Sequence, residues 1–415
     1  MPPTTTSIPI ACVLVITLGT PFAAGQSSGS SQSEEADSIS DALSKGRPSV
    51  NLRYRYELVD DEDFDKHAHA STLRTTLGYR TAPFKGFSLF LEAQNVTHVG
   101  KQRFNNRGAD HLANDVLDRP VVADPSQTRM QQAYLRFDAF DTDFDLGRRQ
   151  IAFGDHRFVG DIAWRQNFQT FDAIYFSNAS IDRTTVSYAF ADKVVRIFGD
   201  EKEMSSHLVN VLVGVNPNIS VELFAYLLDY DAFGDRGLSS QSYGGKLSGS
   251  RPVDERLRVL YEAQYARQTD FGDNPNTRDA TYLHLMGGLG IGDFVNVKAA
   301  RELLSGSRAD GAFQTPLATG HKFNGWADLF LVTPVEGLVD WYVSADGKIR
   351  SLSWSVVYHD FSADEGSRPY GSEIDAQMLH PTPWNMPFGV KVAFYREDGF
   401  ARDVTKLWLW TQYSF

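Results

Sequence analysis

Apolar and polar residues alternate along almost the whole chain, from about residue 48 to its last residue. In the stretch VNLRYRYELV (50–59), Leu52 and Tyr54 alternate with Arg53 and Arg55. The same period returns in LRTTLGYR (73–80), FSLFLEAQ (87–94), LRVLYEAQYA (257–266) and FGVKVAFY (388–395). A period of two predicts β-strands with one apolar and one polar face, so we expect an all-β fold.

The chain ends in KLWLWTQYSF (406–415), which continues this pattern. One face carries Leu407, Leu409, Thr411, Tyr413 and Phe415, and the other carries Lys406, Trp408, Trp410, Gln412 and Ser414. Chain ends of soluble proteins are usually frayed and polar. This segment instead predicts a closing strand, with its apolar face toward lipid and its polar face toward a lumen.

A soluble sandwich also alternates, but three further features favour a membrane barrel. First, aromatic residues lie near the predicted strand ends, where a bilayer has its interfaces: Tyr54, Tyr79, Trp341, Trp354, Tyr358, Trp408 and Trp410. Second, short connectors such as 81–86, 138–143, 216–219, 251–255 and 345–350 contrast with long ones at 96–127, 155–169 and 305–336. Outer-membrane barrels have short periplasmic turns and long external loops.

The third feature is the N-terminus. An apolar run at 8–18, followed by Ala23 and Gly25, predicts a secretory signal in residues 1–25. The segment MPPTTTS before it has no Lys or Arg, and the alternative is a retained anchor. Cys12 is the single cysteine and lies in this run, so a cleaved chain has no thiol for a disulfide, a metal or catalysis. Residues 26–46 are predicted to be a Ser-rich linker with a short helix at 37–45, and residues 47–415 a barrel.

Composition excludes two classes of protein. The net charge of −12 argues against nucleic acid as a partner, because the phosphate backbone is itself negatively charged. No further stretch is apolar for 18 residues, so no transmembrane helix is predicted. The alternation instead accommodates about 18 strands, an even number as single-chain barrels require. Both chain ends then lie on the periplasmic side, and the barrel encloses an aqueous lumen.

Several long strings carry a resemblance to a known family. They include NLRYRYE, GYRTAPFKGFSLFLEAQNV, FGDHRFVGDIAWRQNFQTFDA, AFQTPLATGHKFNGWADLFLVTP and TKLWLWTQYSF. In order from about residue 41 to the end, the chain resembles the alginate export family of outer-membrane barrels. It resembles members of unassigned substrate more than the alginate exporter itself. The resemblance implies an 18-stranded barrel that passes an acidic polysaccharide through a basic constriction. The string GRRQI departs from the family pattern and leaves open whether Arg148 or Arg149 faces the lumen.

The polar faces supply the candidate substrate pathway. Arginine suits carboxylates because its planar fork bonds two oxygens at once. The expected basic pathway residues are Arg53, Arg55, Arg74, Arg80, Arg136, Arg149, Lys246, Arg258, Lys298 and Lys391. The same faces carry the acids Glu57, Glu92, Asp138, Glu262, Glu302, Asp340, Glu373 and Asp375. The two readings are a basic ladder that passes an anionic polysaccharide or small anionic solute, and a paired network in a general uptake porin of mixed selectivity.

Two loops have the composition of a constriction. In HKFNGWADLF, we expect His321, Lys322, Asn324, Trp326 and Asp328 to shape the passage, with an outer-rim loop as the alternative. The string DHRFVGDIAWRQN could form a compact polar cluster, made of Asp155, Arg157, Asp161, Trp164 and Arg165. This cluster could line the passage, and a purely structural role in bracing the loop explains it equally well.

No cofactor, metal or enzymatic activity is expected. The acidic stretch with His67 and His69 matches no defined metal loop. The alternative is a barrel-wall hydrolase that uses His284, His359 or His380, but the sequence contains no nucleophile elbow, zinc-protease motif or phosphate loop. We expect a bacterial outer-membrane monomer in contact with lipid. Tyr413 and Phe415 are its expected signal to the barrel assembly machinery.

Overall fold

The computed structural model describes residues 35–292 and 294–415, so the predicted signal lies outside the described residues. Its strands are β1 (Arg47–Asp61), β2 (Ala68–Arg80), β3 (Phe87–His98), β4 (Gln127–Ala139), β5 (Thr142–Arg149), β6 (Thr170–Asn178), β7 (Thr184–Val195), β8 (Glu201–Asn216), β9 (Ile219–Leu228), β10 (Ser240–Pro252), β11 (Leu257–Asp270), β12 (Asp279–Ile291), β13 (Val295–Leu304), β14 (Gly306–Ser307), β15 (Gly311–Ala312), β16 (Leu338–Ile349), β17 (Leu352–Ser362), β18 (Pro369–His380), β19 (Phe388–Glu397) and β20 (Val404–Ser414). One short helix, α1 (Ile39–Ser44), and three 3-10 turns (Asp110–Leu112, Arg236–Leu238, Gly320–Lys322) complete the described elements.

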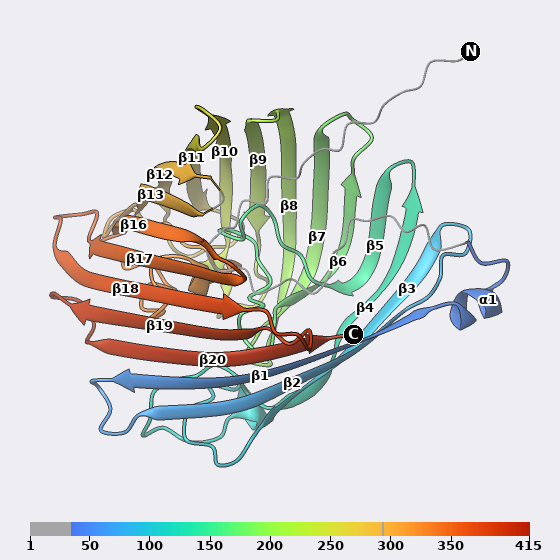
Figure 1. Ribbon diagram of the computed structural model, residues 1–415, viewed down its shortest axis with the longest axis horizontal. Coiled ribbons are helices and arrows are strands. Elements are labelled where there is room, and N and C mark those ends of the chain that lie inside the picture. The colour runs from blue at the N-terminus through green and yellow to red at the C-terminus, as the bar shows by residue number, and fades with distance from the viewer. Residues whose placement is uncertain (1–34, 293) are drawn as a thin grey trace.

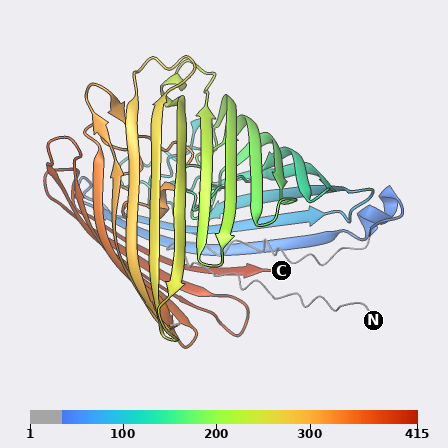
Figure 2. The same ribbon diagram turned by 90° about the horizontal axis from the view of Figure 1, so that it is seen from above.

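Eighteen of the described strands form one antiparallel sheet that closes on itself. Each strand pairs with the next, and β20 returns to pair with β1 from Asn51↔Ser414 to Asp61↔Val404. Figure 1 shows β20 and β1 side by side, and Figure 2 shows the strands of the middle of the chain opposite those of its two ends. Closure leaves no sheet edge unpaired, which is what a barrel in lipid requires. The remaining pair, β14 and β15, is a small hairpin within a loop.

The predicted alternation separates the two faces of the wall. On β1, Arg53, Arg55 and Glu57 point inward and are 1%, 0% and 0% exposed, whereas Leu52 and Tyr54 point outward and are 38% exposed. The outward side chains are apolar because their neighbour is lipid. None of the described helices has the length and apolar character needed to cross a membrane.

The connections differ between the two ends of the barrel, as predicted. Short turns join β2 to β3, β4 to β5 and β16 to β17, for example. The other end carries long loops at 99–126, 150–169 and 305–337. The helix α1 lies beside the short turn between β2 and β3 (Figure 1), and the Ala82 N–H donates to the Ala42 carbonyl.

Two expectations need correction. The first strand begins at Arg47, shortly before the alternating stretch VNLRYRYELV (50–59) from which it was predicted. Trp408 and Trp410 are not interfacial rings, because both point inward and pack on Trp164. Trp408 is fully buried. By contrast, Trp341 and Tyr358 point outward and are about half exposed, as expected of interfacial rings.

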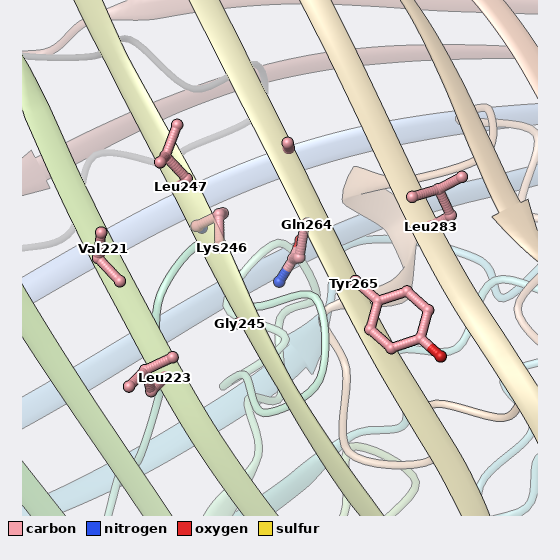
Figure 3. A pocket seen from close by; sticks show the side chains of 9 residues that line it. Val221, Leu223, Gly245, Lys246, Leu247, Gln264, Tyr265 and Leu283 are labelled. Carbon is pink, nitrogen blue, oxygen red and sulfur yellow. The ribbon is translucent and has the colours of Figure 1, made fainter.

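A shallow depression on the outer surface lies at β9–β12 and is lined in part by Gly245. Figure 3 shows the side chains of Val221, Leu223, Leu247 and Leu283 around this glycine. These side chains belong to the lipid-facing side of the wall, so the depression is part of the apolar belt rather than of the lumen.

Candidate functional site: the two lumen loops

Two long loops fold back into the barrel and are joined to each other. We call them loop A (150–169) and loop B (305–337). The Gly160 N–H donates to the Leu317 carbonyl (2.8 Å), and the Thr319 N–H donates to the His156 carbonyl (3.0 Å). Phe158 of loop A packs on Phe313 of loop B, with ring centroids 5.9 Å apart. The two loops therefore form one unit inside the lumen.

Trp164 fixes loop A to the wall where the barrel closes. Its carbonyl accepts a hydrogen bond from Arg53 (2.9 Å) and another from Arg55. Both guanidinium carbons lie 5.3 Å from the centre of its ring. Trp408 and Trp410 of β20 meet the same ring edge-on. These cation–π contacts and the ring packing bury Trp164, which is 4% exposed, and fix its position.

His321 of loop B stacks on Trp164 and links two charged groups. Its Nδ1 lies 2.7 Å from Asp328 Oδ1, and its Nε2 lies 2.8 Å from Lys391 Nζ. When Lys391 is charged it can only donate, so beside it His321 is neutral, accepts at Nε2 and donates from Nδ1 to Asp328. Burial and the neighbouring Lys391 hold the pKa of His321 well below its usual value, despite the opposing effect of Asp328.

Asp328 is the acceptor at the centre of this junction. Besides His321, it accepts from Arg165 Nη2 of loop A (3.0 Å) and from Lys406 Nζ of β20 (2.9 Å). Burial alone would raise the pKa of Asp328, but His321, Lys406 and Arg165 lower it well below its usual value. One carboxylate therefore ties loop A, loop B and the closing strand together.

Loop B also covers an acidic part of the wall on β13, β16 and β18. Asn324 donates to Glu302 (2.7 Å) and to Asp340 (3.2 Å). The backbone N–H groups of Trp326 and Ala327 donate to Asp375 (3.1 Å) and Glu373 (2.7 Å). All four acids are at most 3% exposed. Buried carboxylates require such donors, so the loop removes these four charges from the passage.

Loop A carries a second ionic contact with the wall at Asp155. Lys246 of β10 lies 3.4 Å from Asp155, and Lys322 donates to the Asp155 carbonyl (2.7 Å). Burial alone would raise the pKa of Asp155, but the charges of Lys246 and Lys322 lower it to about 2. Lys246 is shared with Glu222, 3.2 Å away.

The structure divides the predicted basic residues into two groups. Arg53, Arg55, Arg74 and Lys391 lie behind the loops and are at most 7% exposed, so a solute in the lumen does not reach them. The more open group and its partners are Arg80 with Tyr134, Arg136 with Asp145, Lys246 with Glu222, Arg258 with Asn296 and Lys298 with Asp346. The sequence could not separate the groups, because the loops that cover the first one are remote in the chain.

The structure also shows which arginine of the string GRRQI (147–151) faces the lumen. Arg149 lies opposite the buried Phe171 and pairs with Asp145 inside the barrel. Arg148 lies opposite Ala133 and pairs with Asp172 on the outer face (2.7 Å). Asp145 was missed among the predicted lumen acids, although it alternates with Gly147 and Arg149. Asp124, which pairs with Arg55, lies in a loop without any period that would reveal it.

The other acidic residues predicted to face the lumen lie outside the loop B contacts, and each has its own partner or is exposed. Glu57 pairs with Arg165 (3.1 Å), and Glu92 accepts from Gln132 (3.1 Å). Glu262 contacts His284 Nδ1 (2.9 Å), and Asp138 is exposed near the short-turn end. The described residues contain no group of three or more His, Cys, Asp or Glu side chains arranged to hold a metal. Within the predicted His pair, His69 instead bonds Tyr56 (2.8 Å).

A closed barrel with an apolar outer belt, a charged lumen and inward-folded loops defines an outer-membrane channel. The chain belongs to the alginate export family, whose model matches residues 48–269. It is a protein of the bacterial outer membrane, and neither the family nor the similar structures are enzymes.

Solved structures with a similar fold include three channels of low sequence identity. Pseudomonas aeruginosa OpdK with vanillate is 15% identical, with a TM-score of 0.71 over 90% of this chain and 99% of that one. P. aeruginosa OccK9 (OpdG) is 15% identical, with a TM-score of 0.72 over 90% and 99%. Acinetobacter baumannii OccAB2 is 13% identical, with a TM-score of 0.72 over 90% and 98%. None of the curated proteins compared matches the chain.

Proposed function

We propose that this channel passes anionic solutes, of which carboxylated saccharides such as polyuronate fragments are the leading class. Transport is passive diffusion along a gradient, and the chain performs no chemistry. The protein works as a monomer, and the barrel assembly machinery inserts it in the membrane.

The observation that carries this proposal is the burial of the acidic wall under loop B. Glu302, Asp340, Glu373 and Asp375 are at most 3% exposed. The side chains of Arg136 on β4, Lys246 on β10 and Lys298 on β13 remain 20%, 10% and 13% exposed. Covering these four acids while these three bases stay partly accessible favours anions in the passage.

The second candidate is a general porin of mixed selectivity. It is supported by the carboxylate partners of the same bases: Asp145 for Arg136, Glu222 for Lys246 and Asp346 for Lys298. Paired charges have weak fields at a distance, because each partner cancels most of the other's potential.

The reversal potential of single channels in a salt gradient separates the two candidates. Anion selectivity, with current that added oligouronate blocks, supports the anion channel. A reversal potential near zero or of cation sign, without block, supports the general porin. An uncharged oligosaccharide of equal length is the control for simple obstruction of the pore.

A further inference from the structure

Arg301 of β13 is a basic side chain on the outer face of the wall. It alternates with the outward-facing Ala299 and Leu303, and it lies opposite the half-exposed Leu285 of β12 in the strand register. Arg301 is three residues from the end of β13 at Leu304, where loop B begins. At about 3.3 Å per residue this is about 10 Å along a tilted strand, so the long side chain reaches the outer interface of the bilayer.

The guanidinium group of Arg301 has an aromatic neighbour but no carboxylate partner. Its carbon lies 5.7 Å from the centre of the Trp341 ring on β16, which faces outward and is 56% exposed. Arg301 forms no ion pair with any residue in the described part of the chain. An unpaired arginine on the lipid-facing side of a barrel is unfavourable, and an anion that meets it removes much of this cost.

Three other outward-facing arginines near the long-loop ends of the strands do have carboxylate partners. These pairs are Arg148 with Asp172 (2.7 Å), Arg267 with Asp279 (2.8 Å) and Arg396 with Asp403 (2.9 Å). Asp360 of β17 also faces outward, but in the strand register Trp341 lies between it and Arg301. The positive charge of Arg301 is therefore available to a group from the membrane.

Below Arg301, toward the middle of the apolar belt, the side chains of the wall are small. Gly287 of β12 lies opposite Ala299 of β13, and both are exposed on the outer face. A β-carbon at Gly287 would have no atom within 4 Å. Leu285 and Leu289, on either side of this glycine along β12, are 46% and 48% exposed. An acyl chain that lies over the two small residues would place its headgroup at Arg301.

We propose that Arg301 and Trp341 form an outer-leaflet lipid site, in which Arg301 binds the phosphate of an anionic lipid. A phosphate offers two oxygens to the planar guanidinium fork at once. Indole rings favour this depth of the bilayer, and the Trp341 ring restricts the Arg301 side chain before the lipid arrives. The site lies on the outer face of the wall, so the inference goes beyond the proposed function and does not depend on it.

Native mass spectrometry of the full chain, released from detergent micelles, measures lipid binding directly. The probes are lipid A with two phosphates, zwitterionic phosphatidylcholine and inorganic phosphate. The variants are Arg301→Gln, Arg301→Lys and, as the matched control, Arg251→Gln. Arg251 of β10 is an exposed, outward-facing arginine at the short-turn end of the barrel, so its replacement changes the net charge equally at a distant place.

We expect Arg301→Gln to raise the dissociation constant of lipid A about tenfold, as for the loss of one charge-assisted pair. Arg301→Lys should give an intermediate value, since ammonium does not bond two oxygens in one plane. Arg251→Gln and the binding of phosphatidylcholine should show no such change. Equal weakening by Arg301→Gln and Arg251→Gln would indicate non-specific attraction and overturn the site. Inorganic phosphate that binds at Arg301 as tightly as lipid A would overturn the assignment to a lipid.

Asp360→Asn provides a test that misfolding cannot imitate, because it predicts a gain. This carboxylate faces outward on the strand beyond Trp341, and its charge repels a phosphate at Arg301. We expect lipid A to bind about twofold more tightly, and unchanged or weaker binding would count against the site. The measurement is separate from that of the proposed function, since Arg301→Gln should leave the reversal potential of the channel unchanged.

Discussion

Trp164 of loop A stacks on His321 of loop B, with ring centroids 5.0 Å apart and ring planes 4° from parallel. The two residues are separated by more than 150 positions in the chain, and each is anchored to different strands. The Trp164 carbonyl accepts hydrogen bonds from Arg53 and Arg55 of β1, whereas His321 accepts a hydrogen bond from Lys391 of β19. The stack therefore couples the lumen loops to the strands on both sides of the barrel's closure.

Replacing Trp164 by Ala should loosen both loops. Removing a buried tryptophan costs about 3–5 kcal/mol of unfolding free energy. We expect a lower midpoint of urea unfolding and a larger, noisier single-channel conductance. Trp384→Ala is the control, because Trp384 is 75% exposed in a short turn. Wild-type current noise in Trp164→Ala would mean that the stack does not hold the loops.

Gly325 should be irreplaceable for a reason that goes beyond its backbone angle. Its φ is +83°, and a β-carbon there would overlap the Glu373 carboxylate. Gly366 has a similar φ of +78° but open space around it. Both substitutions by Ala incur about 1–2 kcal/mol of backbone strain, but only Gly325→Ala should displace loop B. Conductance traces of the two variants test this, and equal behaviour would contradict it.

Acidification should weaken the junction at His321. Its pKa in the folded protein is lowered, while an unfolded histidine titrates near pH 6.5. The unfolded chain then binds the proton first, so stability from the neutral ring is complete above about pH 6.5 and declines as the pH falls below it. We expect more frequent subconductance states between about pH 6.5 and 5. In His321→Gln this part of the pH dependence should disappear, and an unaltered profile would exclude His321 as its source.

Asp155 predicts a second transition at much lower pH. Its folded pKa is about 2, below the unfolded value of about 3.9. Its contact with Lys246 therefore stabilises the folded protein above about pH 4 and is lost as the pH falls toward 2. Unfolding midpoints measured from pH 5 to pH 2 should decline less steeply in Asp155→Asn than in the wild type. Parallel declines in the two proteins would show that other acids dominate this range.

Asp145→Asn should increase anion selectivity. Asp145 binds Arg136 through two hydrogen bonds (2.7 and 2.8 Å) and also pairs with Arg149. Its loss leaves Arg149 without this carboxylate and leaves Arg136 with Asp143, 3.4 Å away, so the positive charge on the inner wall increases. Asp172 binds Arg148 with the same two distances on the outer face. Asp172→Asn is thus a geometrically matched control that should leave the reversal potential unchanged. A shift of equal size in both variants would argue against selectivity set by lumen charge.

Deleting Phe415 should reduce the amount of protein in the outer membrane. Its backbone N–H and carbonyl both bond Val50 of β1 (2.9 and 2.8 Å), so the deletion shortens the seam. Phe415→Leu retains these backbone bonds and isolates the contribution of the ring. Normal membrane levels of the deletion, measured by fractionation, would refute the expected assembly signal.

The fold was predictable because the alternation of apolar and polar residues is visible within each short stretch of sequence. Alternation at residues such as Leu52 and Arg53 records which side of the wall each side chain occupies, and no long-range information is needed. The inward fold of loop B was also predicted, since residues such as Asn324 and Trp326 combine polar and apolar groups in one segment. The burial of Arg53 and Arg55 was not predictable in this way, because Trp164 covers them from about 110 positions along the chain.

The position of Trp164 also has a consequence for biogenesis. Its binding surface combines β1, the first strand made, with β20, the last. Neither end of the chain can offer that surface until the two strands have met. Loop A can therefore reach its final position only after the barrel has closed. During folding, the protein would pass through a closed barrel whose lumen is not yet occupied by loop A.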